Sequence, residues 1–422
     1  MNNKIDHKLL KKLNKIKFFK LNDYKCGSAL WTTNMYWESD ALIKKSYYKL
    51  LSIPLLSDKY RIRNERGRVL FAFTNSYAER DDYKEWFERL LDLVPEKVVM
   101  TPLRRKDGDA FKAKEIWLIF IWLIQMLQIK CSLKEKLLYC NYMLCGMRNI
   151  LFVKDQIEKH HIKTVVTLCD VHVADYFITE YCNKNHITTI TLQHGCWTNI
   201  TPADKASYRC SLSQYLLTCS RYTKRFGLEL GLSEKKLIPL GIPQLIVYDK
   251  PKIQKKAYEK SKFLVILDHE ENHKYNAAML DICNQFAKQV NMCFDVKLHP
   301  SSDILQKGGY ERIVNKEWGS ILNMKASPKT KQELFSGYEF GVFSQSTMIF
   351  EAIYCLLPVV LYRHEKIIYP EIELPYFSTC KELEDFKDSR KEDVEYWRQL
   401  RDYVCGDGDI IENYAKFLNQ FC

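Results

Sequence analysis

Several patterns that would assign a protein class at once are missing from this chain of 422 residues. None of its fifteen cysteines forms a C-x-x-C pair, and their spacings match neither a metal site nor a disulfide framework. There is no internal repeat and no low-complexity tract. The opening residues carry too many lysines for a secretory signal. We therefore expect reduced, mostly buried thiols in a cytoplasmic protein.

The chain also has no apolar run long enough for an ordinary membrane span. Residues 116–129 read IWLIFIWLIQMLQI, which as a helix extends roughly 21 Å. A bilayer core requires about 20 apolar residues. We expect these residues to form a buried helix or a helix that dips into a membrane interface.

Positive charge is in excess. Lys and Arg number 64 against 52 Asp and Glu, a net charge of +12, which favours anionic partners. Near the start, Ile5, Leu9, Leu13 and Ile16 share one helical face among lysines. This predicts either a helix bound to the anionic inner face of the cell membrane or a solvated helix docked on the body. No RNA-binding or helix-turn-helix signature is present, so nucleic acid is not an expected partner.

From about residue 66 onward, strand-like and helix-like stretches alternate. TVVTLCD and TTITLQHG read as strands, whereas DDYKEWFERLLDLV reads as a helix. The alternation predicts an α/β fold of two doubly wound, Rossmann-like domains that face each other across a cleft. The expected divisions are a basic extension that is membrane-proximal or on the acceptor side (1–65), an acceptor domain (66–248), a linker (249–262), a nucleotide-donor domain (263–385) and helices that pack back on the first domain (386–422).

Two polar side chains follow neighbouring strands of the first domain. Asp170 follows TVVTLC, and His194 follows TTITLQ. Ligands of such sheets bind at the carboxyl ends of the strands. We expect both side chains to face the cleft together with Gln193, Gly195 and Gly241. A histidine in this position can present a base, or it can simply form a turn.

The second domain contains two further stretches of this kind. In VKLHPSSD, Pro300 must end the strand, which places His299 on the loop side beside Lys297. A cation and an imidazole at a strand end suit a phosphate, although His-Pro pairs also occur in ordinary turns.

The second stretch is FSQSTMIFEA. The polar residues Ser344, Gln345, Ser346 and Thr347 stand where a strand meets a helix, so their hydroxyls can cap the helix and its N-terminus can attract an anion. Glu351 follows one turn later and can reach a ribose or acceptor hydroxyl; otherwise it is a surface charge. Together the two stretches predict one phosphate-bearing ligand.

The order QHG, LGIP, KLHP and SQST…EA…LPVV resembles bacterial surface-polysaccharide glycosyltransferases of the GT-B type, over roughly residues 165–362. These include capsule and lipopolysaccharide enzymes, the sialyl- and polysialyltransferases with an HP motif and a Ser/Thr motif, and the CDP-glycerol glycerophosphotransferases. The sialyltransferase resemblance implies that His299, Ser346 and Thr347 hold the donor phosphate. The glycerophosphotransferase resemblance implies that His194 is the base.

One departure bears on the donor. The sialyltransferases carry an acidic-acidic-glycine base motif in the first domain, and this chain has none there. DHEEN, residues 268–272, is acidic but belongs to the second domain. This argues against a CMP-sialic acid donor.

The expected activity is transfer of a sugar from a CMP-, CDP- or UDP-linked donor to a surface polysaccharide or lipid-linked glycan. His194 would be the general base, and Asp170 would orient it or be the base itself. No DxD-type motif stands out, so no obligatory metal is expected. The alternatives are a CDP-glycerol or CDP-ribitol polyol-phosphate transferase, a sugar-nucleotide epimerase, and a non-catalytic glycan-binding scaffold.

Overall fold

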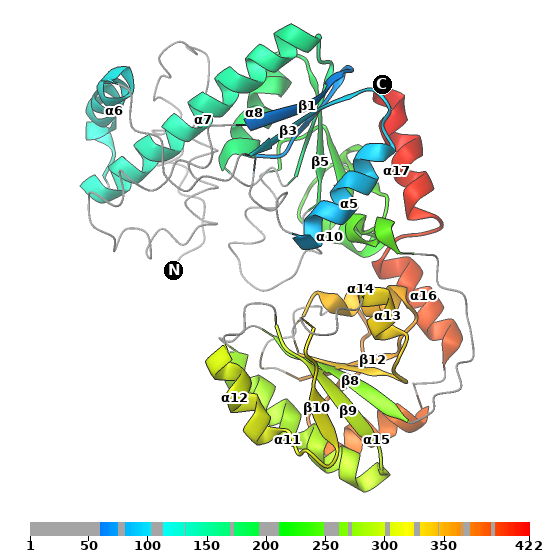
Figure 1. Ribbon diagram of the computed structural model, residues 1–422. Coiled ribbons are helices and arrows are strands. Elements are labelled where there is room, and N and C mark those ends of the chain that lie inside the picture. Colours follow the sequence, from blue (N-terminus) through cyan, green and yellow to red (C-terminus); the bar gives the residue numbers. More distant parts are fainter. Residues whose placement is uncertain are drawn as a thin grey trace.

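The computed structural model describes most of the chain from residue 60 to the C-terminus (Figure 1). The described residues are 60–74, 81–102, 113–130, 132–168, 173–193, 211–248, 261–268, 272–299, 304–324, 330–344, 346–363, 365, 372–389 and 393–422. They form two α/β domains, each with helices on both faces of a sheet, which confirms the predicted fold class. The basic N-terminal helix predicted from the sequence lies outside the described residues.

The first domain is built on a sheet with the strand order β1-β3-β2-β4-β5-β6-β7. Neighbouring strands are parallel except β1 and β3, which are antiparallel. The strands are β1 (Tyr60–Arg66), β2 (Val69–Ala72), β3 (Lys97–Pro102), β4 (Thr164–Thr167), β5 (Thr188–Leu192), β6 (Tyr215–Thr218) and β7 (Leu237–Pro239). Every residue of β2 and β4 is buried, as expected for strands covered on both faces. Because the chain direction across the sheet reverses at β2, the switch point lies between β2 and β4.

The helices of this domain pack closely on the sheet and on each other. They include α5 (Asp81–Asp92), α6 (Ala113–Gln125), η2 (Met126–Gln128), α7 (Leu133–His160), α8 (Val173–Lys184), α10 (Arg221–Glu229), η3 (Glu234–Lys236) and η4 (Pro243–Val247). The long α7 begins with a capping box between Ser132 and Glu135 and ends where His161 adopts the left-handed conformation. None of the described helices is long and apolar enough to cross a bilayer.

The second domain contains a fully parallel sheet in the order β10-β9-β8-β11-β12-β13. This is the Rossmann order, with the switch point between β8 and β11. The strands are β8 (Lys262–Ile266), β9 (Cys293–Lys297), β10 (Gly319–Ile321), β11 (Gly341–Phe343), β12 (Val359–Tyr362) and β13 (Tyr376–Phe377). The helices are α11 (His273–Val290), α12 (Ile304–Ile313), α13 (Lys331–Phe335), α14 (Met348–Tyr354) and α15 (Cys380–Ser389). Figure 1 shows α11 and α12 on one face of the sheet, with α13 and α14 on the other.

The C-terminal segment contacts both domains. It consists of α16 (Val394–Val404), α17 (Ile410–Leu418) and the short η6 (Asn419–Phe421). The Cys405 thiol after α16 donates a hydrogen bond to the carbonyl of Phe350 in α14, at 3.1 Å. The Phe417 and Phe421 rings lie against Tyr215 of β6, with centroids 5.6 and 5.5 Å away.

The expected start of this segment at residue 386 falls inside α15. Phe386 is buried, and its ring packs edge-on against Phe340, with the centroids 5.6 Å apart. Because α15 completes the second core through this contact, the helix belongs with the second domain up to its end at Ser389.

Six of the ten described cysteines are buried, and all ten are free. Burial raises the pKa of the Cys140 thiol to about 12 and raises the pKa values of Cys182 and Cys283 further. These thiols are therefore protonated at neutral pH and behave as small apolar side chains.

Two glycines allow the chain after β7 to touch the C-terminal segment. Gly241 (φ +113°) and Gly406 (φ +115°) both have left-handed backbones. A Cβ added at Gly406 would lie 2.5 Å from the Cα of Gly241, and one added at Gly241 would lie 2.7 Å from the Ile410 side chain. Beside them, the N–H of Ile242 donates to the carbonyl of Cys405 at 3.0 Å. Only glycine fits both positions.

We predict that Gly241→Ala lowers the free energy of unfolding by about 1–3 kcal/mol through backbone strain, and by a further amount through the clash of the new Cβ with Ile410. Gly231→Ala is the matched control, since Gly231 also has a positive φ (+88°) but nothing lies near its Cβ position. Urea unfolding of both variants measures the difference. Equal losses would show that the close contact adds nothing to the backbone strain.

Candidate functional site

The two motifs of the second domain lie at the same edge of its sheet. Lys297 ends β9, Ile266 ends β8 and Phe343 ends β11, and the three residues are paired in register across the sheet. Neighbouring strands are about 4.8 Å apart, so the chain segments after Lys297 and Phe343 begin about 10 Å apart. The HP stretch and the Ser/Thr stretch therefore flank the loop that follows β8.

On the β9 side, Lys297 is buried and His299 is partly shielded from water. Lys297 is 9% exposed, and its ammonium lies 3.5 Å from the carbonyl of Leu298. His299 is half-buried. Pro300 lies outside the described residues. A partly desolvated cation at a strand end interacts more strongly with an anion than an exposed cation does.

On the β11 side, the four polar residues have different environments. Ser344 is fully buried, and its N–H donates to the carbonyl of Ile266 at 3.3 Å. Ser346 is half-buried and Thr347 is exposed, whereas Gln345 lies outside the described residues. Ser344 thus belongs to the sheet, and the accessible hydroxyls on this side are those of Ser346 and Thr347.

The expected capping of α14 is weak. Thr347 occupies the N-cap but makes no side-chain capping bond. The Ser346 hydroxyl accepts a long hydrogen bond, 3.4 Å, from the N–H of Met348. The helix has only seven residues, so its dipole is a small part of any anion binding here.

Glu351 is not a surface charge, which was one of the two alternatives that the sequence allowed. It is 8% exposed. Burial raises the pKa of the Tyr248 hydroxyl strongly, and the nearby charge of Glu351 raises it further. Tyr248 follows η4, and its ring packs edge-on against Tyr354 at 6.0 Å. Glu351 therefore lies where α14 meets the end of the first domain.

Asp268 and Asn276 form a part of this edge that the sequence motifs did not identify. Asp268 follows β8, between the two motifs. The fully buried Asn276 side chain accepts from the N–H of Asp268 and donates to its carbonyl, both at 3.1 Å. The Asp268 carboxylate accepts from Asn272 at 2.5 Å. Asn276 also contacts the Tyr310 hydroxyl at 3.1 Å, so the turn is held in one conformation. The only sequence signal was an asparagine in the first turn of a helix.

The two candidate base residues of the first domain, Asp170 and His194, follow adjacent parallel strands, β4 and β5. Thr167 of β4 pairs with Thr191 of β5, and their hydroxyls are 2.8 Å apart. The segments that follow these strands therefore leave the same edge of the sheet. Asp170, His194 and Gly195 lie on those segments, outside the described residues, and their roles remain predictions.

Two residues expected in the cleft have structural positions. Gln193 is 2% exposed, and its Oε1 accepts from the N–H of Cys219 at 2.8 Å, which joins the ends of β5 and β6. Gly241 lies against Gly406 and Ile410. Another part of the chain thus contacts each residue, and their expected place in the cleft stays a prediction.

The structure adds a buried carboxylate at the switch point of the first sheet. Asp175, in the first turn of α8, is fully buried. The hydroxyl of Thr74, just after β2, donates a hydrogen bond to Asp175 Oδ1. The acid thus links the end of β2 to the helix that begins after the loop containing Asp170. An aspartate inside an apolar helical stretch, HVADYFI, was its only sequence signal.

No protein-family model matches the chain, and no curated protein matches it. Solved structures resemble it at low sequence identity. A protein assigned as a UDP-N-acetylglucosamine 2-epimerase from Listeria monocytogenes is 12% identical with a TM-score of 0.53, over 83% of this chain and 95% of that one. MnaA of S. aureus, solved with UDP, is 12% identical with a TM-score of 0.51, over 84% and 97%. The wall teichoic acid polymerase TagF is 13% identical with a TM-score of 0.45, over 93% and 97%.

At such identities the similarity establishes the fold. The chain has a GT-B-like fold of two Rossmann-like domains. The resemblance to sialyltransferases in particular rests on the short motifs alone.

We predict that Asn276→Leu and Asn284→Leu both destabilise the protein, because each leaves two backbone groups without their side-chain partner; the loss should be about 1–3 kcal/mol for the fully buried Asn276 and smaller for Asn284, whose partner Asn315 is exposed. The two asparagines lie on one face of α11, and Asn284 holds the Ile313–Asn315 turn with the same pair of bonds, at 2.8 and 3.0 Å. Only Asn276→Leu should also weaken nucleotide binding, measured by calorimetry below the melting temperature. Equal nucleotide affinities in the two variants would remove the Asp268 turn from the site.

Proposed function

We propose that the protein is a glycosyltransferase that moves a sugar from a nucleotide-activated donor to a surface polysaccharide or a lipid-linked glycan. The observation that carries this proposal is the Rossmann strand order of the second domain. It brings Lys297, His299, Ser346 and Thr347 to the edge where such sheets bind nucleotides. The fold similarity to a protein solved with UDP supports a nucleotide as the ligand.

The donor is proposed to lie across the end of β8. Lys297 and His299 would meet the phosphates from one side, and the hydroxyls of Ser346 and Thr347 from the other. The Asp268 carboxylate between them disfavours a phosphate but accepts hydrogen bonds from ribose hydroxyls. As the sequence motifs led us to expect, the proposed donor is a CMP-, CDP- or UDP-linked sugar.

The acceptor is proposed to bind from the first domain. His194 would take the proton of the acceptor hydroxyl as its oxygen attacks the anomeric carbon, and the nucleotide phosphate would leave with the electrons of the broken C–O bond. Lys297 and His299 would stabilise the charge that develops on that phosphate. Asp170 would orient the imidazole.

A thermal-shift panel of CMP, CDP, UDP and GDP tests the ligand class, because a ligand at 100 times its Kd stabilises the native state by about 2.7 kcal/mol. The corresponding activated donors are then assayed with and without acceptor. Nucleotide release that requires an acceptor supports a transferase. A changed sugar that stays on the nucleotide would indicate an epimerase. Transfer of glycerol phosphate or ribitol phosphate from its CDP-linked donor, in place of a sugar, would indicate a polyol-phosphate transferase. Nucleotide binding without any turnover would indicate a scaffold.

His299→Ala should weaken nucleotide binding about 10- to 100-fold, the expected loss of a hydrogen bond to a charged phosphate. His186→Ala is the control, because His186 is exposed and follows α8 in the other domain. Titration calorimetry and melting temperature are measured on both. An unaltered affinity in a folded His299→Ala protein would remove the imidazole from the donor site.

His194→Ala should lower turnover by about 10²- to 10⁴-fold, the usual share of general base catalysis. Donor affinity should be unchanged, because the proposed phosphate contacts belong to the second domain. The acidic limb of the pH–rate profile should disappear with the imidazole. Substantial turnover in His194→Ala together with its loss in Asp170→Asn would reassign the base to Asp170.

A further inference from the structure

Helix α6 is apolar around its whole circumference, but the protein covers only one side of it. At about 100° per residue, the exposed positions of α6 and η2 fall within an arc of about 100°. These side chains are 50–74% exposed: Ile116, Trp117, Phe120, Ile124 and Leu127. The opposite side is buried against α7 and consists of Ile119, Trp122 and Met126. A helix that is apolar all round normally lies inside a protein or a membrane.

The outward orientation of this side is fixed. Glu115, in the first turn of α6, receives two hydrogen bonds from Arg148 of α7, at 2.7 and 2.5 Å, and both side chains are largely buried. Trp122 and Met126 are completely buried on the same side of the helix. Turning the apolar stripe inward would break this bidentate pair and empty that core.

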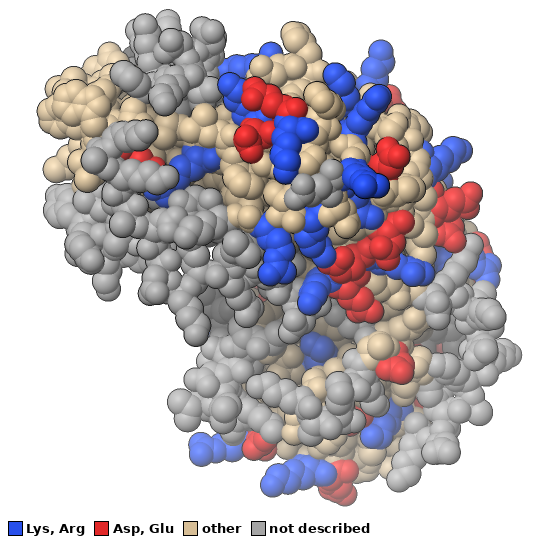
Figure 2. Space-filling model, turned by 45° about the horizontal axis from the view of Figure 1, so that its top comes forward, with Lys and Arg blue, Asp and Glu red and all other residues tan. Residues whose placement is uncertain are grey.

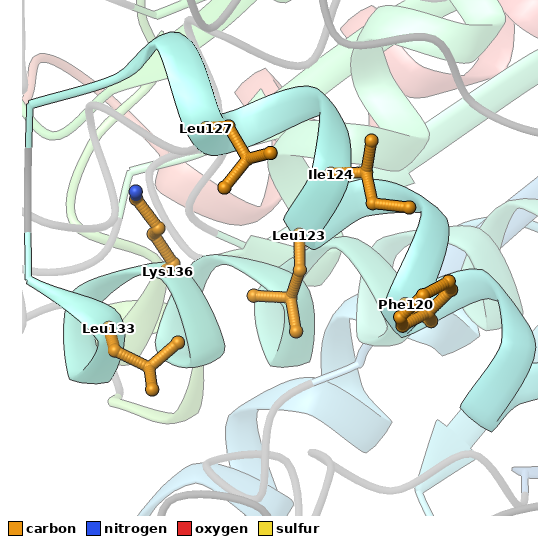
Figure 3. A pocket seen from close by; sticks show the side chains of 6 residues that line it. All are labelled: Phe120, Leu123, Ile124, Leu127, Leu133 and Lys136. Carbon is orange, nitrogen blue, oxygen red and sulfur yellow. The ribbon is translucent and has the colours of Figure 1, made fainter.

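The outward side has the shape and composition of a membrane-contacting surface. The rings of Trp117 and Phe120 are stacked with centroids 5.7 Å apart, and aromatic side chains of this kind favour the membrane interface. Beside them, α6, η2 and the first turns of α7 enclose a hollow of about 280 Å³ (Figure 3). Its lining residues are Phe120, Leu123, Ile124, Leu127, Leu133 and Lys136.

Among the described residues from 116 to 136, the charges beside this surface are mainly positive. Lys130 is exposed, and Lys134 and Lys136 are half-buried. Residues 116–134 include no acid, and the next one, Glu135, is engaged in the capping box of α7. Figure 2 shows an area without charged side chains at the same end of the molecule as α6. In a symmetric dimer through this surface the two lysine clusters would be brought towards each other, which disfavours a second copy as the occupant.

We propose that the exposed side of α6 and η2 docks on an anionic phospholipid bilayer. The helix lies in the plane of the interface, its apolar side chains reach the acyl chains, and Lys130, Lys134 and Lys136 face lipid phosphates. This surface is distinct from the basic helix predicted near the N-terminus. The docking does not depend on the transferase reaction.

The test is flotation of the full-length protein with vesicles of phosphatidylcholine alone and of equimolar phosphatidylcholine and phosphatidylglycerol. Trp117→Gln/Ile124→Gln should bind the mixed vesicles at least about tenfold more weakly than the native protein. Leu228→Gln/Val394→Gln is the matched control, because these apolar side chains are 40% and 46% exposed elsewhere on the surface. Lys130→Gln/Lys134→Gln should lower the preference for phosphatidylglycerol about tenfold.

Trp117→Phe provides a second measurement in a variant that keeps the apolar surface. Lipids with brominated acyl chains should quench native fluorescence more than that of Trp117→Phe. Equal quenching, equal flotation of the Gln variant and the native protein, or an equal loss in the control would overturn the proposal. A different outcome is that light scattering shows the native protein and the control variant to be dimers and the Trp117→Gln/Ile124→Gln variant to be a monomer. Together with unchanged flotation, that result would assign the surface to a second copy of the chain.

Discussion

One close backbone contact, between Gly241 and Gly406, joins the end of the first sheet to the C-terminal segment. The contact leaves no room for a side chain at either residue, and it brings the chain after β7 against the chain after α16. The Ile242–Cys405 and Cys405–Phe350 hydrogen bonds continue from this point into α14 of the second domain. The last strand of the first sheet, helix α14 of the second domain and the C-terminal segment therefore meet at one place.

Three of the buried or partly buried polar groups hold chain segments near the strand ends. Asp175 links β2 to α8, Asn276 holds the Asp268 turn, and Glu351 lies where α14 meets Tyr248. Burying such groups costs free energy unless partners compensate for the lost water. Loops held still at strand ends would suit the proposed transfer between two substrates.

The α6 surface adds a separate property to the first domain. A bidentate ion pair between Arg148 and Glu115 sets the direction of an apolar stripe, and lysines border it. A protein docked in this way would encounter a lipid-linked acceptor by diffusion in the plane of the membrane. Some of the lysines that give the chain its net positive charge thus lie in two particular places, beside the apolar surface of α6 and at the end of β9.

The sequence determined the features that depend on near neighbours. The alternation of strands and helices, the polar break before β8 and the termination of β9 at the HP motif follow from local periodicity and backbone geometry, and together they predicted two Rossmann-like domains. It also placed Lys297 and Ser346 at strand ends. Only the tertiary structure decided that Gln193 joins two strands, that Gly241 meets the C-terminal segment, that Asp268 lies between the HP and Ser/Thr stretches and that one apolar side of α6 is exposed. Each of these depends on which strands are adjacent or on residues far along the chain, and contacts at such separations leave no periodic trace in the sequence.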